Sequence, residues 1–523
     1  MGELIDDVTF LDEIEGYCSP LSVAAGEPVR LHVSTRSERY SVVVERWGAQ
    51  RRVVWSADSL GGVHHRVPAN ADAEGCNWPA SLEITTSRDW ESGFYLVTLT
   101  AEDAPTGRDT AHACFVVRSP EPSGAPLLVL GTNTWNAYNN WGGCSLYTGG
   151  HQVSFRRPFA RGLLSRVPTE RDDRKARPVR WDEEPDADGD RYMAFRAEHG
   201  YPAAIGSAGW FTHERRFVEW AETAGHRFDY AISSDLDRDP SVVNGHHLVI
   251  SVGHDEYWSA GQRATVENHV AGGGDLFSMS GNTMFWQVRL VGDADHMVCH
   301  KYRAHIDDPV MGTDDEHTMS GMWGDPVVGR PESALFGAAS AWGLYHRFGQ
   351  ATARGVGGFL VYRDDHWLLA GTGLRYGDVL GARDGVVGYE TLGCRIQLDE
   401  FHQPVRAGGD GTPDVHTIIA MVPSSNLGVG DYPKSISALS DQGDLEFLAE
   451  RLHGGVTDDN KRRVRNGNAV MVECQPHGKS GGRVVTIGTT DWVFGLATDP
   501  MVARVTENAL SELTSAANGQ TSG

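Results

Sequence analysis

Short runs of alternating apolar and polar residues fill the first 120 positions of the chain. The segments PVRLHVST, YSVVVERWG, SLEITT, GFYLVTLTA and HACFVVR are rich in β-branched and aromatic residues and end at turn-forming residues. Period-two alternation with regular turns is typical of an antiparallel sandwich. The pattern therefore predicts an immunoglobulin-like β-sandwich domain over residues 1–120.

The hydrophobic pattern changes after SPEPSGAP, residues 119–126, which has the composition of a linker. The segments PLLVLG (126–131), HLVISVG (247–253) and DLFSMSG (275–281) are continuous apolar runs. Such runs are typical of strands that are buried on both faces of a parallel sheet. Residues 121–523 are therefore expected to form a second domain of the α/β class.

Helical segments separate these strands. THERRFVEWAETAG ends in glycine, and SAGQRATVENHVAGGG begins with Ser259 as the expected N-cap and ends in glycines. Alternation of strand, helix and strand predicts right-handed crossovers between parallel strands.

The C-terminal half contains shorter strands between glycines. GGFLVYRDD, HWLLAGTG and CRIQLDE predict a β-rich insertion at about residues 335–405. HTIIAMVP (416–423) and GRVVTIGTTDWVFGL (482–496) are expected to return to the central sheet.

Composition and charge exclude several classes of partner. The 523 residues carry a formal net charge of −24, which opposes binding to nucleic acid or to anionic lipid surfaces. The acidic N-terminus lacks the features of a signal peptide, and no apolar run is long enough to span a membrane, so a cytoplasmic location is expected. The seven cysteines are scattered and include no CxxC pair, which indicates reduced thiols.

Candidate functional side chains follow the ends of the three predicted strands. Ligands in α/β sheets bind beyond the carboxyl ends of the strands, so the segments TNTWNAYNNWGGCSLY, GHDEYW and GNTMFWQ should share one rim. This rim would hold Tyr138, Tyr147, His254, Glu256 and Asn282.

The spacing of His254 and Glu256 places both side chains on one face of an extended segment, with Asp255 directed away. Two tyrosinates and a carboxylate would suit a hard, oxygen-preferring cation such as ferric iron. Taken singly, however, a tyrosine in a loop usually serves packing, and an acidic residue before a helix usually serves the helix dipole.

The segments AYNNWGGCSLY, SVGHDEYWS, GGGDLFSMSGNTMFWQVR and GTTDWVFGL resemble the large (beta) subunit of N,N-dimethylformamidase and its relatives. The resemblance covers most of the chain after residue 120 and the N-terminal sandwich less specifically. It implies a class I glutamine amidotransferase-like α/β fold and hydrolysis of the C–N bond of a small amide or formamide.

The resemblance also implies a mononuclear ferric iron, Fe(3+), held by two tyrosines and one glutamate. Matched to this sequence, the metal ligands would be Tyr138, Tyr147 and Glu256, with His254, Glu256 and Asn282 as catalytic residues. Tyr192 in DRYMAF is an alternative to Tyr147. The family enzyme also has a lectin-like region and a small partner subunit, for which this sequence has no evident counterpart, while a homo-oligomer stays possible.

His254 is the expected proton shuttle, because an unperturbed imidazole pKa near 6.5 allows proton transfer in both directions at neutral pH. Asn282 would hold the substrate or its oxyanion with its amide.

Three other interpretations remain. A cysteine hydrolase would use Cys144, although a structural thiol is the more common role for such a residue. A non-catalytic carbohydrate- or protein-binding module would use exposed tryptophans at positions 135, 141, 258 and 286. Another iron-dependent reaction on a C–N substrate is the third.

Overall fold

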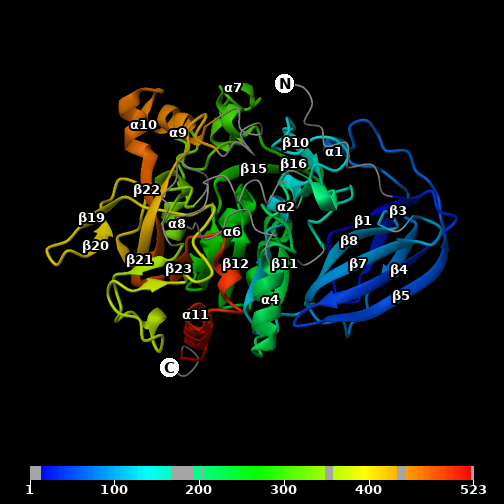
Figure 1. Cartoon of the computed structure of the whole chain (residues 1–523), viewed down its shortest axis with the longest axis horizontal. Coiled ribbons are helices and arrows are strands. Elements are labelled where there is room, and N and C mark those ends of the chain that lie inside the picture. The colour runs from blue at the N-terminus through cyan, green and yellow to red at the C-terminus, as the bar shows by residue number, and fades with distance from the viewer. Residues whose placement is uncertain are drawn as a thin grey trace.

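The computed structural model describes residues 13–105, 107–166, 194, 196–202, 204–347, 357–432 and 443–519. It is a mixed α/β structure with several sheets (Figure 1). The N-terminal sheets, coloured blue, lie on one side of a large central sheet, and helices flank that sheet.

The N-terminal part contains two sheets that enclose one apolar core. The first has the order β1-β3-β6, and the second has the order β2-β8-β7-β4-β5. Their strands are β1 (Ile14–Ser19), β2 (Ser22–Ala24), β3 (Pro28–Thr35), β4 (Arg39–Trp47), β5 (Arg51–Gly61), β6 (Leu82–Thr85), β7 (Gly93–Ala101) and β8 (Thr110–Arg118). Leu31, Val97 and Phe115 lie in the shared core. The five strands expected from the sequence are confirmed, whereas the immunoglobulin-like assignment and the boundary at residue 120 stay predictions.

The central sheet has nine strands in the order β11-β9-β12-β14-β23-β22-β21-β17-β18. The first five strands are parallel to one another, and each later strand is antiparallel to its neighbour. The strands are β9 (Leu127–Leu130), β11 (Asp229–Ile232), β12 (Leu248–His254), β14 (Asp275–Gly281), β17 (Phe359–Val361), β18 (Val379–Leu380), β21 (Val415–Ser425), β22 (Asn466–Gln475) and β23 (Val484–Ile487). The expected parallel neighbours β9, β12 and β14 are confirmed, as are the returning strands β21 and β23. The amidotransferase-like assignment stays a prediction.

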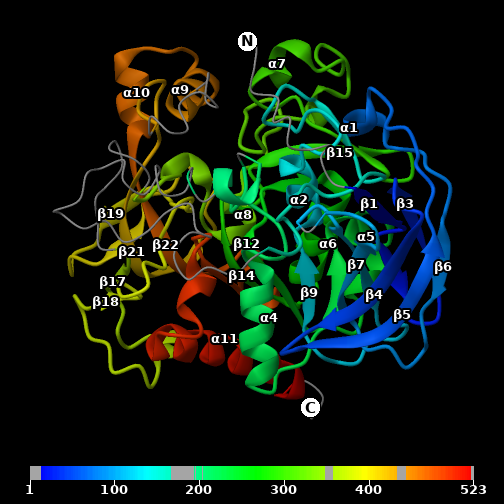
Figure 2. The same cartoon turned by 45° about the vertical axis from the view of Figure 1, so that its right-hand side comes forward.

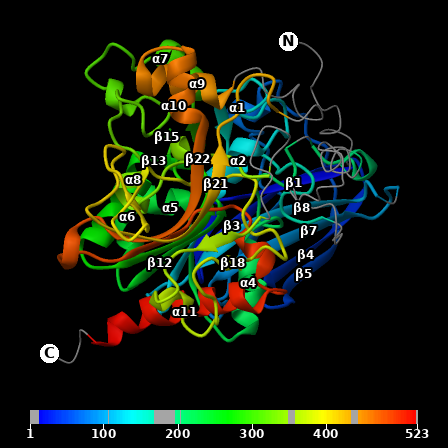
Figure 3. The same ribbon diagram turned by 60° about the vertical axis from the view of Figure 1, so that its left-hand side comes forward.

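Helices cover both faces of this sheet. Alternate side chains of β9 and β12, such as Leu128 and Ile250, share a core with α4 and α11, while Leu127 and Val249 share a core with α5 and α6. The turned views display α4 and α6 on opposite sides of β12 (Figures 2 and 3). The longer helices are α4 (Glu214–Thr223), α6 (Ala260–Ala271), α9 (Asp444–His453), α10 (Asp458–Arg465) and α11 (Pro500–Gly519), while α5 (Ser233–Arg238) is short. The expected N-cap of α6 is confirmed, because the Ser259 hydroxyl accepts the N–H of Gln262 at 3.1 Å.

A small sheet follows the carboxyl ends of two parallel strands, since β13 comes shortly after β12 and β15 shortly after β14. The sheet has the order β10-β16-β15-β13 and consists of β10 (Gln152–Ser154), β13 (Tyr257–Ser259), β15 (Trp286–Val291) and β16 (His296–Val298). Other short helices are α1 (Ala71–Glu74), α2 (Thr132–Tyr138), α7 (Ala304–Asp307) and α8 (Ser333–Phe336).

The expected β-rich insertion is only partly a separate β structure. Strands β17 and β18 extend the edge of the central sheet, while β19 (Ile396–Leu398) and β20 (Pro404–Arg406) form their own hairpin (Figure 1). The strand expected at HWLLAGTG is wrong, because residues Trp367–Leu369 form a 3-10 turn. In that turn the ring of His366 accepts the N–H of Leu368. Both Leu368 and Leu369 are buried, which the alternating faces of a half-buried strand would not allow.

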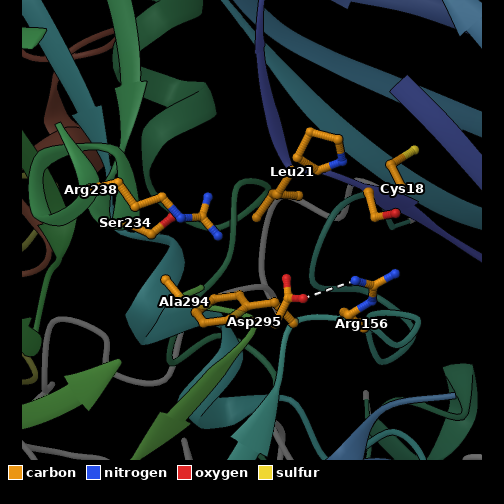
Figure 4. Close-up of a pocket in the computed structure, with 10 residues that line it drawn as sticks. Cys18, Leu21, Arg156, Ser234, Arg238, Ala294 and Asp295 are labelled. Carbon is orange, nitrogen blue, oxygen red and sulfur yellow. Dashed lines mark hydrogen bonds and ion pairs between the residues drawn. The ribbon is translucent and has the colours of Figure 1, made fainter. Parts of the chain in front are cut away.

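The N-terminal sheets contact the α/β part through both apolar and polar side chains. Phe94, Leu96 and Val116 belong to the same apolar core as the central sheet. The Arg46 guanidinium pairs with Glu222 at 2.8 Å, and the Trp47 indole donates to Glu219 at 2.9 Å. A pocket between the two parts contains the Arg156–Asp295 ion pair at 2.9 Å, with Arg238 on its other side (Figure 4).

Candidate functional site

Three parallel strands deliver the candidate residues to one region. Strand β9 leads into α2, which ends at Tyr138; β12 ends at His254; and Asn282 follows β14. The register pairs His254 with Gly281, the residue before Asn282. Parallel register thus brings His254 and Asn282 together despite their separation in sequence.

Glu256 is the centre of this region. Its carboxylate accepts the Tyr138 hydroxyl at 3.0 Å and the Tyr147 hydroxyl at 2.8 and 2.9 Å. The Trp286 indole donates to the same carboxylate at 2.8 Å. The two tyrosine rings stack with their centroids 4.2 Å apart. The structure therefore brings all three expected ligands together, although Glu256 is more than one hundred positions from either tyrosine in the chain.

His254 lies between two carboxylates. Its Nε2 atom is 2.7 Å from Glu390 Oε2 and 3.3 Å from Glu256 Oε2, while Nδ1 lies 2.7 Å from the Ser207 carbonyl oxygen. Burial lowers the pKa of His254, but the charges of Glu390 and Glu256 outweigh this effect and raise the pKa to about 9. The expectation of an unperturbed pKa near 6.5 is therefore wrong: at neutral pH this imidazole is protonated.

Asp255 points away from this cluster, as the sequence predicted. Its carboxylate accepts the Ser251 hydroxyl at 2.8 Å, and Ser251 belongs to β12 itself. The residue supports the end of the strand and does not face Glu256.

Asn282 is held by two neighbours. Its Nδ2 atom donates to Glu390 at 3.2 Å, and its Oδ1 atom accepts the Ser340 hydroxyl at 2.6 Å. Its φ of 48° lies in the left-handed region, which asparagine adopts more readily than most residues do. These contacts fix the amide with one N–H directed to Glu390.

Glu390 is a site residue that sequence reasoning missed. It joins His254 and Asn282, yet it lies 108 positions from Asn282 in the chain. A signal was present, because Glu390 is the only charged residue in GVVGYETLGC, residues 385–394. That signal indicates an unusual buried charge but says nothing of its partners.

Lys301 is a second missed residue. Its Nζ atom lies 3.2 Å from the centre of the Tyr147 ring and within 5.9 Å of the rings of Tyr257, Trp286 and Tyr302. Among the described residues its ammonium group has no hydrogen bond and no ion pair. Burial lowers its pKa to about 8, while the charge of Glu256 opposes this shift. A cation thus faces the ring of one candidate ligand.

A family described as "N,N-dimethylformamidase beta subunit-like, C-terminal" matches residues 41–507. The chain belongs to this family. The match begins within β4, so the N,N-dimethylformamidase beta subunit-like region includes most of the N-terminal sheets as well as the candidate site.

Other comparisons add little to this family assignment. A search of curated proteins found no match. The solved structure of a beta-glucuronidase (GUS) from Parabacteroides merdae aligns with 52% of this chain, at 11% sequence identity and a TM-score of 0.14. The aligned region spans 28% of that protein, and so low a score carries no argument about fold or activity.

Several sequence expectations of this dimethylformamidase beta subunit-like chain are changed by burial. The tryptophans at 135, 141, 258 and 286 are buried, so the expectation that they are exposed for sugar stacking is wrong. Burial and the charge of Asp72 raise the pKa of Cys144, which does not favour a reactive thiolate. Tyr192, the alternative ligand, lies outside the described residues.

Among the residues that the structure describes, no group of three or more His, Cys, Asp or Glu side chains is arranged to hold a metal ion. The tyrosine-rich set around Glu256 is a different type of donor group. No helix in the described part of this family member has the length and apolar character needed to cross a membrane.

Proposed function

We propose that this chain is an iron-dependent hydrolase that cleaves the C–N bond of a small amide or formamide. The observation that carries the proposal is the meeting of the Tyr138 and Tyr147 hydroxyls on the Glu256 carboxylate, within 3.0 Å. Membership of the dimethylformamidase beta subunit-like family supports the hydrolase class.

The donor set fits a ferric ion. Tyr138, Tyr147 and Glu256 would hold it, because a hard cation prefers phenolate and carboxylate oxygens. Loss of the two phenol protons would leave three anionic oxygens close together in a buried place, which is unfavourable without a cation. A bound ferric ion would supply a Lewis acid for a carbonyl oxygen and would lower the pKa of a bound water.

Proton transfer is assigned to His254. With Nε2 2.7 Å from Glu390, the imidazolium can pass its proton to that carboxylate and then accept a proton from the attacking water. Return of the proton through Nε2 would allow the nitrogen to leave as a neutral amine. The Ser207 carbonyl oxygen keeps Nδ1 occupied, so Nε2 is the nitrogen that acts.

Asn282 would hold the substrate. One of its two amide hydrogens is directed to Glu390, and the second remains to bind a carbonyl oxygen or its oxyanion. Ser340 holds the amide oxygen and so maintains this orientation.

A direct test is elemental analysis of the purified protein with its visible spectrum, followed by an assay of amine release from formamide and its N-methyl derivatives. The proposal expects about one iron per chain, a tyrosinate-to-iron charge-transfer band, and hydrolysis. A non-catalytic binding module would give neither iron nor amine release. Another iron-dependent reaction would give the band without hydrolysis.

The assembly of this chain is open to a separate test. The family description names a beta subunit, and a partner subunit or a homo-oligomer for this chain is a proposal. Light scattering of the purified chain, alone and after co-purification from its source, would measure both.

A further inference from the structure

The segment from Asn139 to Ser154, which we name the tyrosine loop, runs from the end of α2 through β10 and carries Tyr147. It begins directly after Tyr138, so one stretch of chain positions both candidate tyrosine ligands. Between α2 and β10 the tyrosine loop consists of turns and irregular backbone. Helix or strand hydrogen bonds therefore do not fix the position of Tyr147.

A single buried side chain binds both ends of the tyrosine loop. The guanidinium of Arg157 donates to the carbonyl oxygens of Ser154 at 3.0 Å and Asn139 at 2.8 Å, and also to the carbonyl oxygen of Trp141. A longer contact of 3.4 Å reaches the side chain of Asn136 in α2. All of these acceptors belong to the stretch that carries Tyr138 and Tyr147.

The charge of Arg157 is not used in an ion pair. Among the described residues no carboxylate lies within ion-pair distance of its guanidinium, in contrast to Arg46, which pairs with Glu222. Burial lowers the pKa of Arg157 to about 10, so the group remains a cation at neutral pH. A buried cation without an ion-pair partner is costly. Here backbone and amide oxygens compensate for it at hydrogen-bond distance, and the more distant charge of Asp72 opposes the lowering of its pKa.

We propose that Arg157 is a positioning residue that holds the tyrosine loop closed and so sets Tyr147, together with Tyr138, against Glu256. Its planar fork contacts several oxygens at once, which a lysine cannot reproduce. The role of these tyrosines as ligands rests on the proposed function, whereas the closure of the loop by Arg157 does not.

The first arm of the test measures loop closure in metal-free protein by hydrogen exchange and mass spectrometry. Arg157→Ala should raise amide exchange in residues 139–154 at least tenfold. Ethylguanidinium added to the buffer should bring the exchange rate back toward the wild-type value, because it can fill the space that the side chain leaves. Arg157→Lys, which keeps the charge and is the milder change, should give an intermediate rise. The proposal would be overturned if the tyrosine loop exchanged at the wild-type rate in Arg157→Lys, or in Arg157→Ala that is folded.

Arg263 provides the matched control. It is also buried and also donates to backbone carbonyls, those of Arg330 and Pro331, but it lies outside the candidate site. Arg263→Ala should leave exchange in residues 139–154 unchanged. If it loosens the tyrosine loop as much as Arg157→Ala does, the effect is general destabilisation and the assignment is wrong.

The second arm measures iron affinity by titration of the metal-free protein. Arg157→Ala should bind iron at least tenfold more weakly, with recovery on addition of ethylguanidinium, and Tyr147→Phe should bind more weakly without such recovery. Unchanged affinity in Arg157→Ala, with Tyr147→Phe impaired, would overturn the positioning role. If the wild-type protein binds no iron, the proposed function fails, and the exchange measurement still decides the role of Arg157.

Discussion

Two buried regions of this molecule are built in opposite ways. The space between the two N-terminal sheets is filled by apolar side chains such as Val97, Leu99 and Phe115. The space beyond the carboxyl ends of the parallel strands holds His254, Glu256, Glu390 and Lys301, none of them more than 7% exposed. Both regions are buried from water, but only the second encloses ionisable side chains, which are better solvated in water.

The difference separates stability from function. Apolar burial stabilises the folded state by roughly 25 cal/mol per Å² of surface removed from water. Burial of ionisable groups costs free energy unless they pair, and in the candidate site they compensate one another through short contacts. A cluster of this kind lowers stability. Substitutions in the candidate site should therefore change activity, whereas substitutions in the N-terminal core should change stability.

The largest effect is expected for Glu256→Gln. Removing the carboxylate should strip the iron and its visible band, and activity should fall by roughly 1000-fold or more, because metal catalysis contributes several kcal/mol. Metal analysis and amide assays would measure this loss.

Glu214→Gln is the matched control, since Glu214 is also buried and also accepts a tryptophan indole, that of Trp135, at 2.8 Å. It should keep iron and activity. Full iron and full activity in Glu256→Gln would make the site assignment wrong.

His254→Ala should have the next largest effect. It should retain iron and colour yet lose roughly 100-fold or more in turnover, the usual size of a general acid-base contribution. Asp255→Asn, one position away and directed elsewhere, should stay within a few-fold of wild type. Normal turnover in His254→Ala would exclude it as the shuttle, and loss of iron in His254→Ala but not in Glu256→Gln would reverse the two roles.

A third prediction concerns a buried carboxyl group outside the candidate site. Burial raises the pKa of Glu332 to about 8, and its Oε1 atom has no hydrogen-bond partner. The folded state therefore holds a proton that the unfolded chain releases above about pH 4.5, and stability is lost as pH rises from there to about 8.

Glu332→Gln should remove this contribution, which amounts to about 1.4 kcal/mol per pH unit within that window. Urea unfolding at pH 5 and pH 8 would test it. The free energy of unfolding of the variant should increase relative to that of the wild-type protein as pH rises. The exposed Glu83→Gln should follow the wild-type curve, and parallel curves for Glu332→Gln and wild type would contradict the prediction.

The smallest effect is expected in the N-terminal core. Ile84→Val removes one buried methylene group from β6 and should cost about 1 kcal/mol of stability. Iron content and turnover per folded molecule should not change, as measured by denaturant unfolding alongside the assays. Loss of iron from a folded Ile84→Val protein would contradict this prediction, because it would show that the N-terminal core affects the candidate site.

Much of the candidate site could be predicted from the sequence because its parts follow strand ends. Tyr138 is the last residue of the short helix after β9, His254 is the last residue of β12, and Asn282 comes directly after β14. Loops after parallel strands share one edge of the sheet, so local pattern was enough to group them. Glu390 and Lys301 follow no such strand, and nothing local connects them to the same place.

Errors in the fold have the same origin. HWLLAGTG has the composition of a strand, but its two leucines are both buried in a 3-10 turn. Tertiary packing, not local composition, determines this conformation. The sequence also predicts the wrong pKa for His254, because that pKa depends on the charge of Glu390, which lies 136 positions away in the chain.

The sequence by itself determined the alternation of strands and helices, the N-terminal sheets, and the face shared by His254 and Glu256, since these depend on periodicity and on neighbouring residues. Only the tertiary structure decided that two tyrosines meet one carboxylate, that Glu390 and Lys301 join them, and that His254 is charged at neutral pH. The physical reason is that burial and Coulomb interactions depend on distance in space, and these partners are mostly about one hundred or more residues apart in the chain.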